Sequence, residues 1–136
     1  MAGSMFESGS TPALLAVVLL VAMGIAHSYL GERYILIRLF KRDDLPKLFG
    51  GAAFTTGTLR FAWHLTTIAW WGLACLAYLA AGQTLDAAQT LRIIAVLALV
   101  SGIFPIVFTR GRHLSWIIFF AVAALLFASS AGAVPQ

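Results

Sequence analysis

The chain has 136 residues, of which 61% are hydrophobic and only 10% are charged. A soluble domain is roughly half apolar and about a quarter charged, so this composition excludes an ordinary water-soluble protein. The net charge of +4 could suit a nucleic-acid-binding protein, but the apolar stretches leave no folded soluble module to carry a binding surface. The composition therefore indicates a membrane protein with the lipid bilayer as its first partner, and no nucleic acid.

Four apolar stretches are long enough, or nearly long enough, to cross a bilayer core, which takes about 20 helical residues. We expect spans at about residues 12–34, 59–81, 91–109 and 113–132, and a loop at 41–57. They fill almost the whole chain, which predicts an all-α, polytopic, four-helix transmembrane bundle in one domain of residues 1–136. The residues before the first span include Glu7 but no Lys or Arg, so we expect a retained span and no secretory signal.

Basic residues are distributed unevenly between the two ends of these spans. Of the nine Lys and Arg residues, only Arg92 lies at the end that carries the loop at 83–90. Cytoplasmic connections are enriched in Lys and Arg, so the loops after the first and third spans are predicted to be cytoplasmic. This predicts an N-out, C-out, multi-pass protein, most simply of a bacterial inner (plasma) membrane.

Four ionisable or imidazole side chains gather near the predicted cytoplasmic ends of the helices. Glu32 is the only carboxylate on a membrane helix, and His27, His64 and His113 come from three different spans, all near the predicted cytoplasmic side. Ionisable groups within membrane segments are costly and usually face the bundle interior with a partner. A functional site is expected there, although no motif identifies a catalytic residue, a reaction or a substrate.

The first hypothesis for this site is a haem b held between His27 and His64, in an electron-transfer type of protein. Gly24 and Gly31 flank His27 at i−3 and i+4, where a porphyrin would need room, and Arg60 could meet the propionates. The layout would then be analogous to a four-helix membrane cytochrome b. No family motif is matched residue by residue.

The second hypothesis is a transition-metal centre. Neutral imidazoles from His27, His64 and His113, with Glu32 as a further ligand, form a set of the kind that binds zinc, copper or iron. No local ligand spacing, such as two histidines at i and i+4, supports either hypothesis. The simplest alternative is that the three histidines are structural, with His64 and His113 at a membrane interface and His27 bonded to a backbone carbonyl.

Two further functions belong to other classes. A small dimeric transporter or proton relay could use Glu32 and His27, although the polar groups lie at one side and transporter sites usually lie near the midplane. An accessory subunit of a larger complex, or a homo-oligomer, could associate through the small residues Ala124, Ala128 and Gly132 of the last span.

Several other residues carry specific expectations. Arg60, His64, Thr67 and Trp71 share one stripe of the second span, because they recur at helical spacing. The single cysteine, Cys75, excludes an internal disulfide and is expected to be a small buried filler. Ser28 beside His27, and Ser115 near His113, should point away from these imidazoles on a helix and form no nucleophile–base pair.

Overall fold

A computed structural model describes residues 10–132, so that Glu7 and the last four residues lie outside the described part. Its elements are α1 (Ser10–Leu30), η1 (Gly31–Leu36), α2 (Ile37–Leu39), α3 (Ala53–Ala81), α4 (Ala87–Thr109) and α5 (Ser115–Gly132). The protein is all-α, as predicted.

Four helices are long and apolar enough to cross a membrane. They are Thr11–Leu39, in which α1, η1 and α2 run on continuously, Ala53–Ala81, Ala87–Thr109 and Ser115–Gly132. The four spans expected from the sequence are therefore present, and the chain is a small multi-pass membrane protein in contact with lipid.

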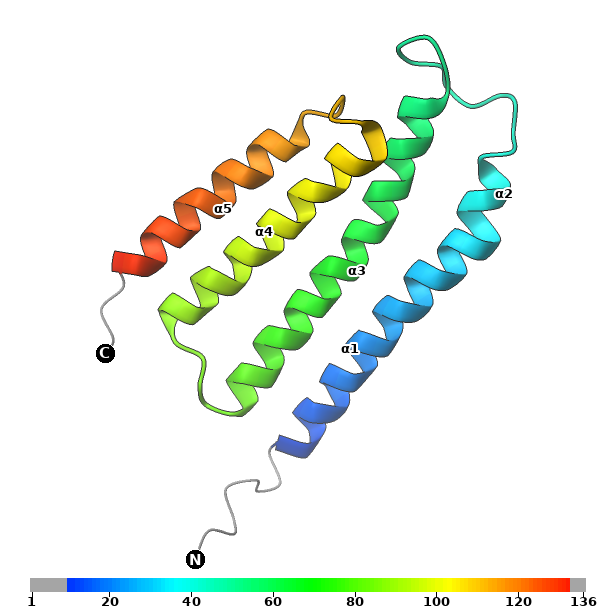
Figure 1. Ribbon diagram of the computed structural model, residues 1–136. Coiled ribbons are helices and arrows are strands. Elements are labelled where there is room, and N and C mark those ends of the chain that lie inside the picture. The colour runs from blue at the N-terminus through cyan, green and yellow to red at the C-terminus, as the bar shows by residue number, and fades with distance from the viewer. Residues whose placement is uncertain (1–9, 133–136) are drawn as a thin grey trace, which may run out of the picture.

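The helices lie side by side in the order α1, α3, α4, α5, each antiparallel to the next (Figure 1). Between Ser10 and Gly132, α1 packs on α3, α3 on α4 and α4 on α5, and no contact joins α1 to α4 or α5, or α3 to α5. The four-helix bundle is thus a flat, single layer. Because no second layer covers it, many large apolar side chains remain exposed to the surrounding lipid.

Small residues bring the neighbouring helices together. Gly57 lies against the backbone of Phe108, and Gly72 receives the side chain of Leu97, so α3 and α4 approach closely at two levels. Gly102 of α4 receives Phe120 of α5. Without a hydrophobic driving force between helices in lipid, association relies on such close van der Waals contacts.

Small residues of α4 are buried, whereas the small-residue seam predicted on α5 is not. Ala95 and Ala98 of α4 are buried in the layer. On α5 the buried positions are Ala123 and Ser130, while the predicted seam of Ala124, Ala128 and Gly132 is exposed on the outer edge. Within the described chain no helix covers that seam.

Two helices begin earlier than expected. We expected spans from about 59 and 91, but α3 begins at Ala53 and α4 at Ala87. Asp86 precedes α4 and accepts a hydrogen bond from the backbone N–H of Gln89, whose side chain in turn accepts from the Asp86 N–H. This capping box satisfies two backbone donors that would otherwise be unpaired at the helix start.

Cys75 differs from the expectation of a buried filler. Its side chain is exposed on α3, because the single layer leaves this face of the helix uncovered. The sequence could identify Cys75 as a membrane-embedded residue but could not show that the helices form only one layer.

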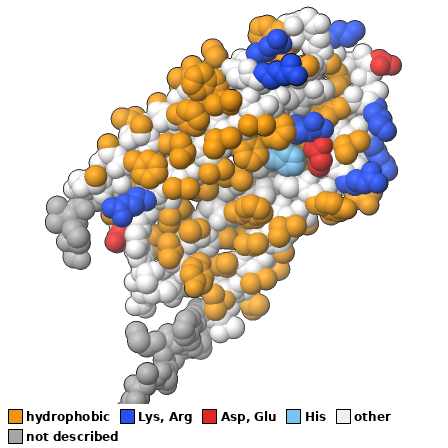
Figure 2. All heavy atoms as spheres, viewed as in Figure 1, with side chains coloured by type: hydrophobic (Ala, Val, Ile, Leu, Met, Phe, Trp, Pro, Cys, Tyr) orange, Lys and Arg blue, Asp and Glu red, His pale blue; other side chains and the backbone are white. Residues whose placement is uncertain are grey.

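The basic residues gather at the end of the layer that holds residues 40–52 and the α4–α5 turn, and a lone basic group lies at the other end (Figure 2). In the exposed loop after α2, Arg42 and Asp44 form an ion pair. The hydrogen bond from Arg42 lowers the pKa of the Asp44 carboxyl below its usual value. The unequal distribution of basic residues between the two ends of the layer supports the N-out, C-out orientation. This orientation stays a prediction from the sequence.

Candidate functional site

The first membrane span changes its helical geometry where Glu32 occurs. Residues Gly31–Leu36 form a π-helix, and the backbone N–H of Ile37 bonds to the carbonyl of Glu32. A π segment widens the turn by one residue and rotates the side chains that follow, and such segments are frequent at functional sites. Here it joins α1 to the end of the span, and it includes Glu32.

Two tryptophans of α3 fit against two glycines of the first span. The indole of Trp71 lies over Gly24 and the indole of Trp63 over Gly31, so closely that a Cβ at either glycine would clash. Trp63 Nε1 donates to the carbonyl of His27 at 3.1 Å, and Trp71 Nε1 donates to that of Val21 at 3.3 Å. These glycines, predicted to leave room for a porphyrin, instead accommodate indole rings.

Glu32 forms an ion pair with Arg60 across the interface between the first span and α3. Arg60 Nη2 lies 2.8 Å from Glu32 Oε1, and Arg60 Nε donates to Oε2 at 3.1 Å. About a third of each side chain is exposed. Two parallel N–H···O contacts fix the orientation of the carboxylate as well as its position. Arg60 was expected near propionates, but here its guanidinium contacts a carboxylate of its own chain.

His64 connects this ion pair to a row of hydroxyl groups. Its Nε2 lies 3.4 Å from Glu32 Oε2, and its Nδ1 lies 2.8 Å from the hydroxyl of Ser28. The Ser28 hydroxyl is 2.8 Å from that of Thr67, which donates to the carbonyl of Gly24 at 3.2 Å. The contacts form one continuous row, which we call the Glu32–Thr67 network.

Donor counting assigns the protons along this row. The single hydroxyl proton of Thr67 goes to the Gly24 carbonyl, so the Ser28 hydroxyl must donate to Thr67. Ser28 then has only lone pairs to offer His64, and the proton of that contact must reside on Nδ1 of the imidazole. A neutral His64 therefore presents a lone pair at Nε2 toward the Glu32 carboxyl.

His27 lies beside this network but does not belong to it. Its Nε2 is 2.8 Å from the hydroxyl of Thr66 and 3.3 Å from the carbonyl of Trp63. The ring stacks on Trp63 at 4.6 Å between centroids and meets the edge of Trp70 at 5.0 Å. The relay hypothesis named Glu32 together with His27, but the imidazole that the Glu32 carboxylate contacts is that of His64.

His113 contacts a different set of residues from the other two histidines. It packs against Phe54 and Phe61, and its Nδ1 lies 2.8 Å from the hydroxyl of Ser115. The expectation that Ser115 points away from His113 was therefore wrong, because His113 precedes α5 and is not on a helix. Among residues 10–132 no group of three or more His, Cys, Asp or Glu side chains is placed to hold a metal ion.

The stripe predicted on the second span does line this interface. Arg60, His64, Thr67 and Trp71 all contact the first span, at Glu32, Ser28, Gly24 and Val21. Sequence reasoning missed Ser28 as a partner, although it lies four residues before Glu32 and hence on the same helical face. Thr66 was missed as well, and its sequence position gave no comparable signal.

Comparison with known proteins adds no relative. No family model, no curated protein and no solved structure matches the chain. The functional conclusion therefore depends on the geometry of the site.

Proposed function

We propose that this membrane protein binds and releases a proton at the surface that carries the basic loops, with Glu32 and His64 as the proton-binding pair. This would be the proton-handling part of a small transporter or of a larger membrane complex. The supporting observation is the contact between Glu32 Oε2 and His64 Nε2. When His64 Nδ1 carries the proton directed at Ser28, His64 Nε2 and Glu32 Oε2 are both hydrogen-bond acceptors. Their contact becomes a hydrogen bond only when one further proton lies between these two atoms.

The surroundings of the pair suit this role. Imidazole can take up a proton at one nitrogen while the other keeps its hydrogen bond, and the Ser28–Thr67 hydroxyls hold His64 in one tautomer. Arg60 balances the charge of Glu32, which lowers the cost of an ionised carboxylate at a membrane boundary. The pair is only partly buried, with 31% of the Glu32 side chain and 17% of the His64 side chain exposed, and we propose that it exchanges its proton with water through this exposed part.

The row of hydroxyls ends within the membrane. From Glu32 to Gly24 the distance along the first span is about 12 Å at 1.5 Å per residue, less than half of a core about 30 Å thick. Thr67 donates to a backbone carbonyl, which cannot pass a proton on. The network is therefore a proton-binding site at one surface, and a complete pathway would need groups from another subunit.

Haem ligation by His27 and His64 is the competing hypothesis, and the contacts support it less. The Thr67 hydroxyl reaches the Gly24 carbonyl directly, and the indoles fill the glycine positions, so α1 and α3 touch where a porphyrin would have to enter. The visible absorption spectrum of the purified protein tests this hypothesis directly.

Infrared difference spectroscopy of the protein in vesicles, recorded between alkaline and acidic pH, tests the proposal. We expect a carboxyl band that is lost in Glu32→Gln, kept in the control Asp43→Asn, and altered in His64→Gln. Gln at position 32 can donate its amide N–H to His64 Nε2, so the variant should remain folded while it loses the titrating group. A spectrum in which Glu32→Gln removes no band would overturn the proposal.

A further inference from the structure

His27 carries an unpaired hydrogen-bond acceptor at the surface of the first span and α3. Its Nε2 lies 3.3 Å from the Trp63 carbonyl, which can only accept, so Nε2 carries the proton of the neutral ring. The Thr66 hydroxyl gives its own proton to that carbonyl and accepts from the same Nε2–H at 2.8 Å. His27 Nδ1 therefore presents a lone pair, and it has no hydrogen-bond partner within residues 10–132.

Trp70 supplies the matching unpaired donor. Its ring meets that of His27 at 5.0 Å between centroids. The N–H groups of the other three tryptophans donate to backbone carbonyls, whereas that of Trp70 has no partner in the described chain. Both residues are half-buried. Thr58 Oγ1 is the one buried and unpaired side-chain N or O atom of residues 10–132, so His27 Nδ1 and Trp70 Nε1 both reach the molecular surface.

This donor and this acceptor lie inside the hydrocarbon region. Counted from the Glu32–Arg60 ion pair at the helical rise of 1.5 Å, His27 is about 8 Å and Trp70 about 15 Å farther into the membrane. Tryptophan is otherwise enriched at membrane interfaces, where water and head groups can bond to its N–H. Acyl chains offer no such partner, and a polar group left without a hydrogen bond costs free energy. The two unpaired atoms thus indicate that another polar surface covers this face.

The same side of α3 is shaped for a neighbouring helix. Three small side chains lie along the stripe that holds Trp63 and Trp70, and all three are exposed. They are Ala62, Thr66 and Ala69, which recur at helical spacing. Small residues let two helices approach closely in lipid, where association depends on van der Waals packing and interhelical hydrogen bonds.

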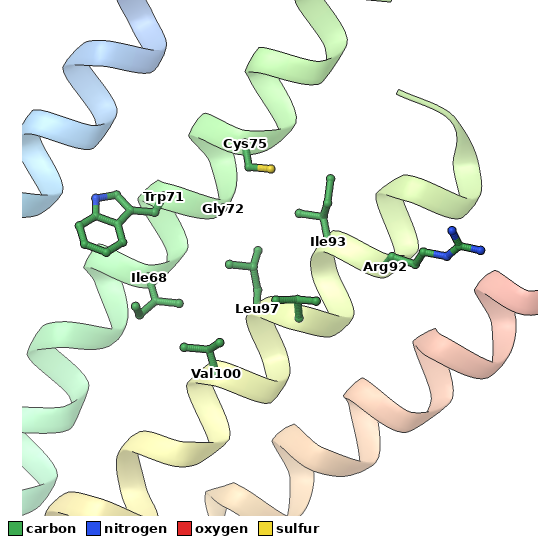
Figure 3. A pocket seen from close by; sticks show the side chains of 9 residues that line it. Ile68, Trp71, Gly72, Cys75, Arg92, Ile93, Leu97 and Val100 are labelled. Atoms are coloured by element: carbon green, nitrogen blue, oxygen red, sulfur yellow. The ribbon is translucent and has the colours of Figure 1, made fainter. Parts of the chain in front are cut away.

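A groove between α3 and α4 lies on another side of α3. Ile68 is two residues before Trp70, and hence on nearly the opposite side of the helix. It lines the groove together with Gly72 and Leu97 (Figure 3). Ile68 therefore serves as a reference position for the side of α3 that faces away from His27 and Trp70.

We propose that a second copy of this chain covers the His27–Trp70 face, with a two-fold axis along the membrane normal between the first span and α3. A two-fold interface must be self-complementary, and this face carries one donor and one acceptor, so that each Trp70 N–H meets the partner's His27 at Nδ1. Two copies inserted in the same orientation hold these groups at the same depth. The first span of each copy lies on α3 of the other, and α4 and α5 extend beyond the contact.

Dimerisation in lipid vesicles, followed by energy transfer between labelled copies as lipid dilutes the protein, tests the hydrogen bonds. Trp70→Phe keeps an aromatic ring, and its N–H makes no bond within the described chain that could be lost. We expect a dimer about eightfold weaker, for two interhelical hydrogen bonds of average strength. Adding Trp70→Phe to His27→Phe should have no further effect, because the same bonds are already absent. Trp116→Phe, whose indole bonds to Gly111 of its own chain, should leave the dimer unchanged.

Disulfide cross-linking between differently tagged copies tests the arrangement, with Cys75→Ser in every variant. One copy carries Met23→Cys and the other Ala69→Cys. Both positions are exposed and lie nine residues, about 14 Å, from the Glu32–Arg60 ion pair. We expect this pair to cross-link. The control replaces Ala69→Cys by Ile68→Cys, at nearly the same depth on the groove side of α3, and should cross-link much less.

Several results would overturn the proposal. One is a protein that stays monomeric in vesicles, and another is a dimer that Trp70→Phe does not weaken. Equal cross-linking of Met23→Cys with Ala69→Cys and with Ile68→Cys would place the contact elsewhere. A monomer that binds a hydroxyl-bearing lipid, with binding lost in Trp70→Phe, would assign His27 Nδ1 and Trp70 Nε1 to a lipid site instead of a second copy.

Discussion

The two outer helix pairs are held together by different means. The first span and α3 share an ion pair, a row of hydroxyl–imidazole contacts and two indoles bonded to backbone carbonyls. Between the bodies of α4 and α5, no side-chain hydrogen bond is found in the described part of the chain, and Phe120 packs on Gly102. The α4–α5 pair shows that apolar packing suffices for helix association in lipid. Polar groups between the first span and α3 are thus more than is needed for assembly, which favours a functional role.

The largest expected effect comes from the close fit of glycine and tryptophan between the first span and α3. In Gly31→Ala the new methyl group would overlap the Trp63 indole, so one of the two must shift. We expect a loss of about 1–3 kcal/mol in the free energy of unfolding, as for other overpacked sites. Reversible unfolding in detergent measures it.

Gly132→Ala is the matched control, because no atom of residues 10–132 lies within 4 Å of a Cβ at that position. It should leave stability unchanged or slightly higher, since alanine favours a helix over glycine. Equal losses in Gly31→Ala and Gly132→Ala would mean that the indole does not fill the space over Gly31.

A second, smaller effect should come from the ion pair. Arg60→Gln leaves Glu32 without its partner, and because each side chain is about a third exposed we expect a loss of only about 1–2 kcal/mol. The double variant Arg60→Gln with Glu32→Gln should recover part of this loss, because no unpaired carboxylate remains.

The double-mutant cycle, measured by unfolding in detergent, gives the coupling between the two residues. Arg112→Gln, an exposed residue of the α4–α5 turn, serves as the control and should have little effect. Strict additivity of the two substitutions would contradict the pairing of Arg60 with Glu32.

The smallest effect concerns the hydroxyl row. Thr67→Val keeps the shape of the side chain but removes the hydrogen bonds to Ser28 and to the Gly24 carbonyl. Hydrogen bonds between membrane helices contribute about 0.6 kcal/mol on average, so we expect a loss of about that size. Ser129→Ala on α5, whose hydroxyl bonds only within its own helix, should change stability less. A larger loss at Ser129 than at Thr67 would reverse the comparison between the two helix pairs.

The sequence predicted the spans and the helix face that carries the site, but not the partners within the site. Hydropathy predicts four spans because each must satisfy its backbone within a helix. Helical spacing placed Arg60, His64, Thr67 and Trp71 on one face, and all four contact the first span.

The pairing itself depends on features that the sequence does not show. The fit of Trp63 and Trp71 over two glycines fixes the separation of the helices, and the π-helix at Gly31–Leu36 occurs where Glu32 meets Arg60. Depth alone could not decide between His27 and His64 as the partner of Glu32. The predicted depth also suggested that His113 lies beside the other two histidines. In the structure His113 instead contacts the Ser115 hydroxyl and the rings of two phenylalanines.

The protonation of the His64 imidazole tests the central claim most directly. Nitrogen NMR of protein labelled with ¹⁵N-histidine, with His64 assigned by comparison with His64→Gln, reports whether each ring nitrogen carries a proton. The account predicts a protonated Nδ1 at every pH at which the network is intact, and an Nε2 that gains its proton together with the Glu32 pair as the pH falls. In Glu32→Gln the same Nδ1 should stay protonated while Nε2 accepts from the new amide. A neutral wild-type imidazole with a bare Nδ1 and a protonated Nε2 would contradict the account.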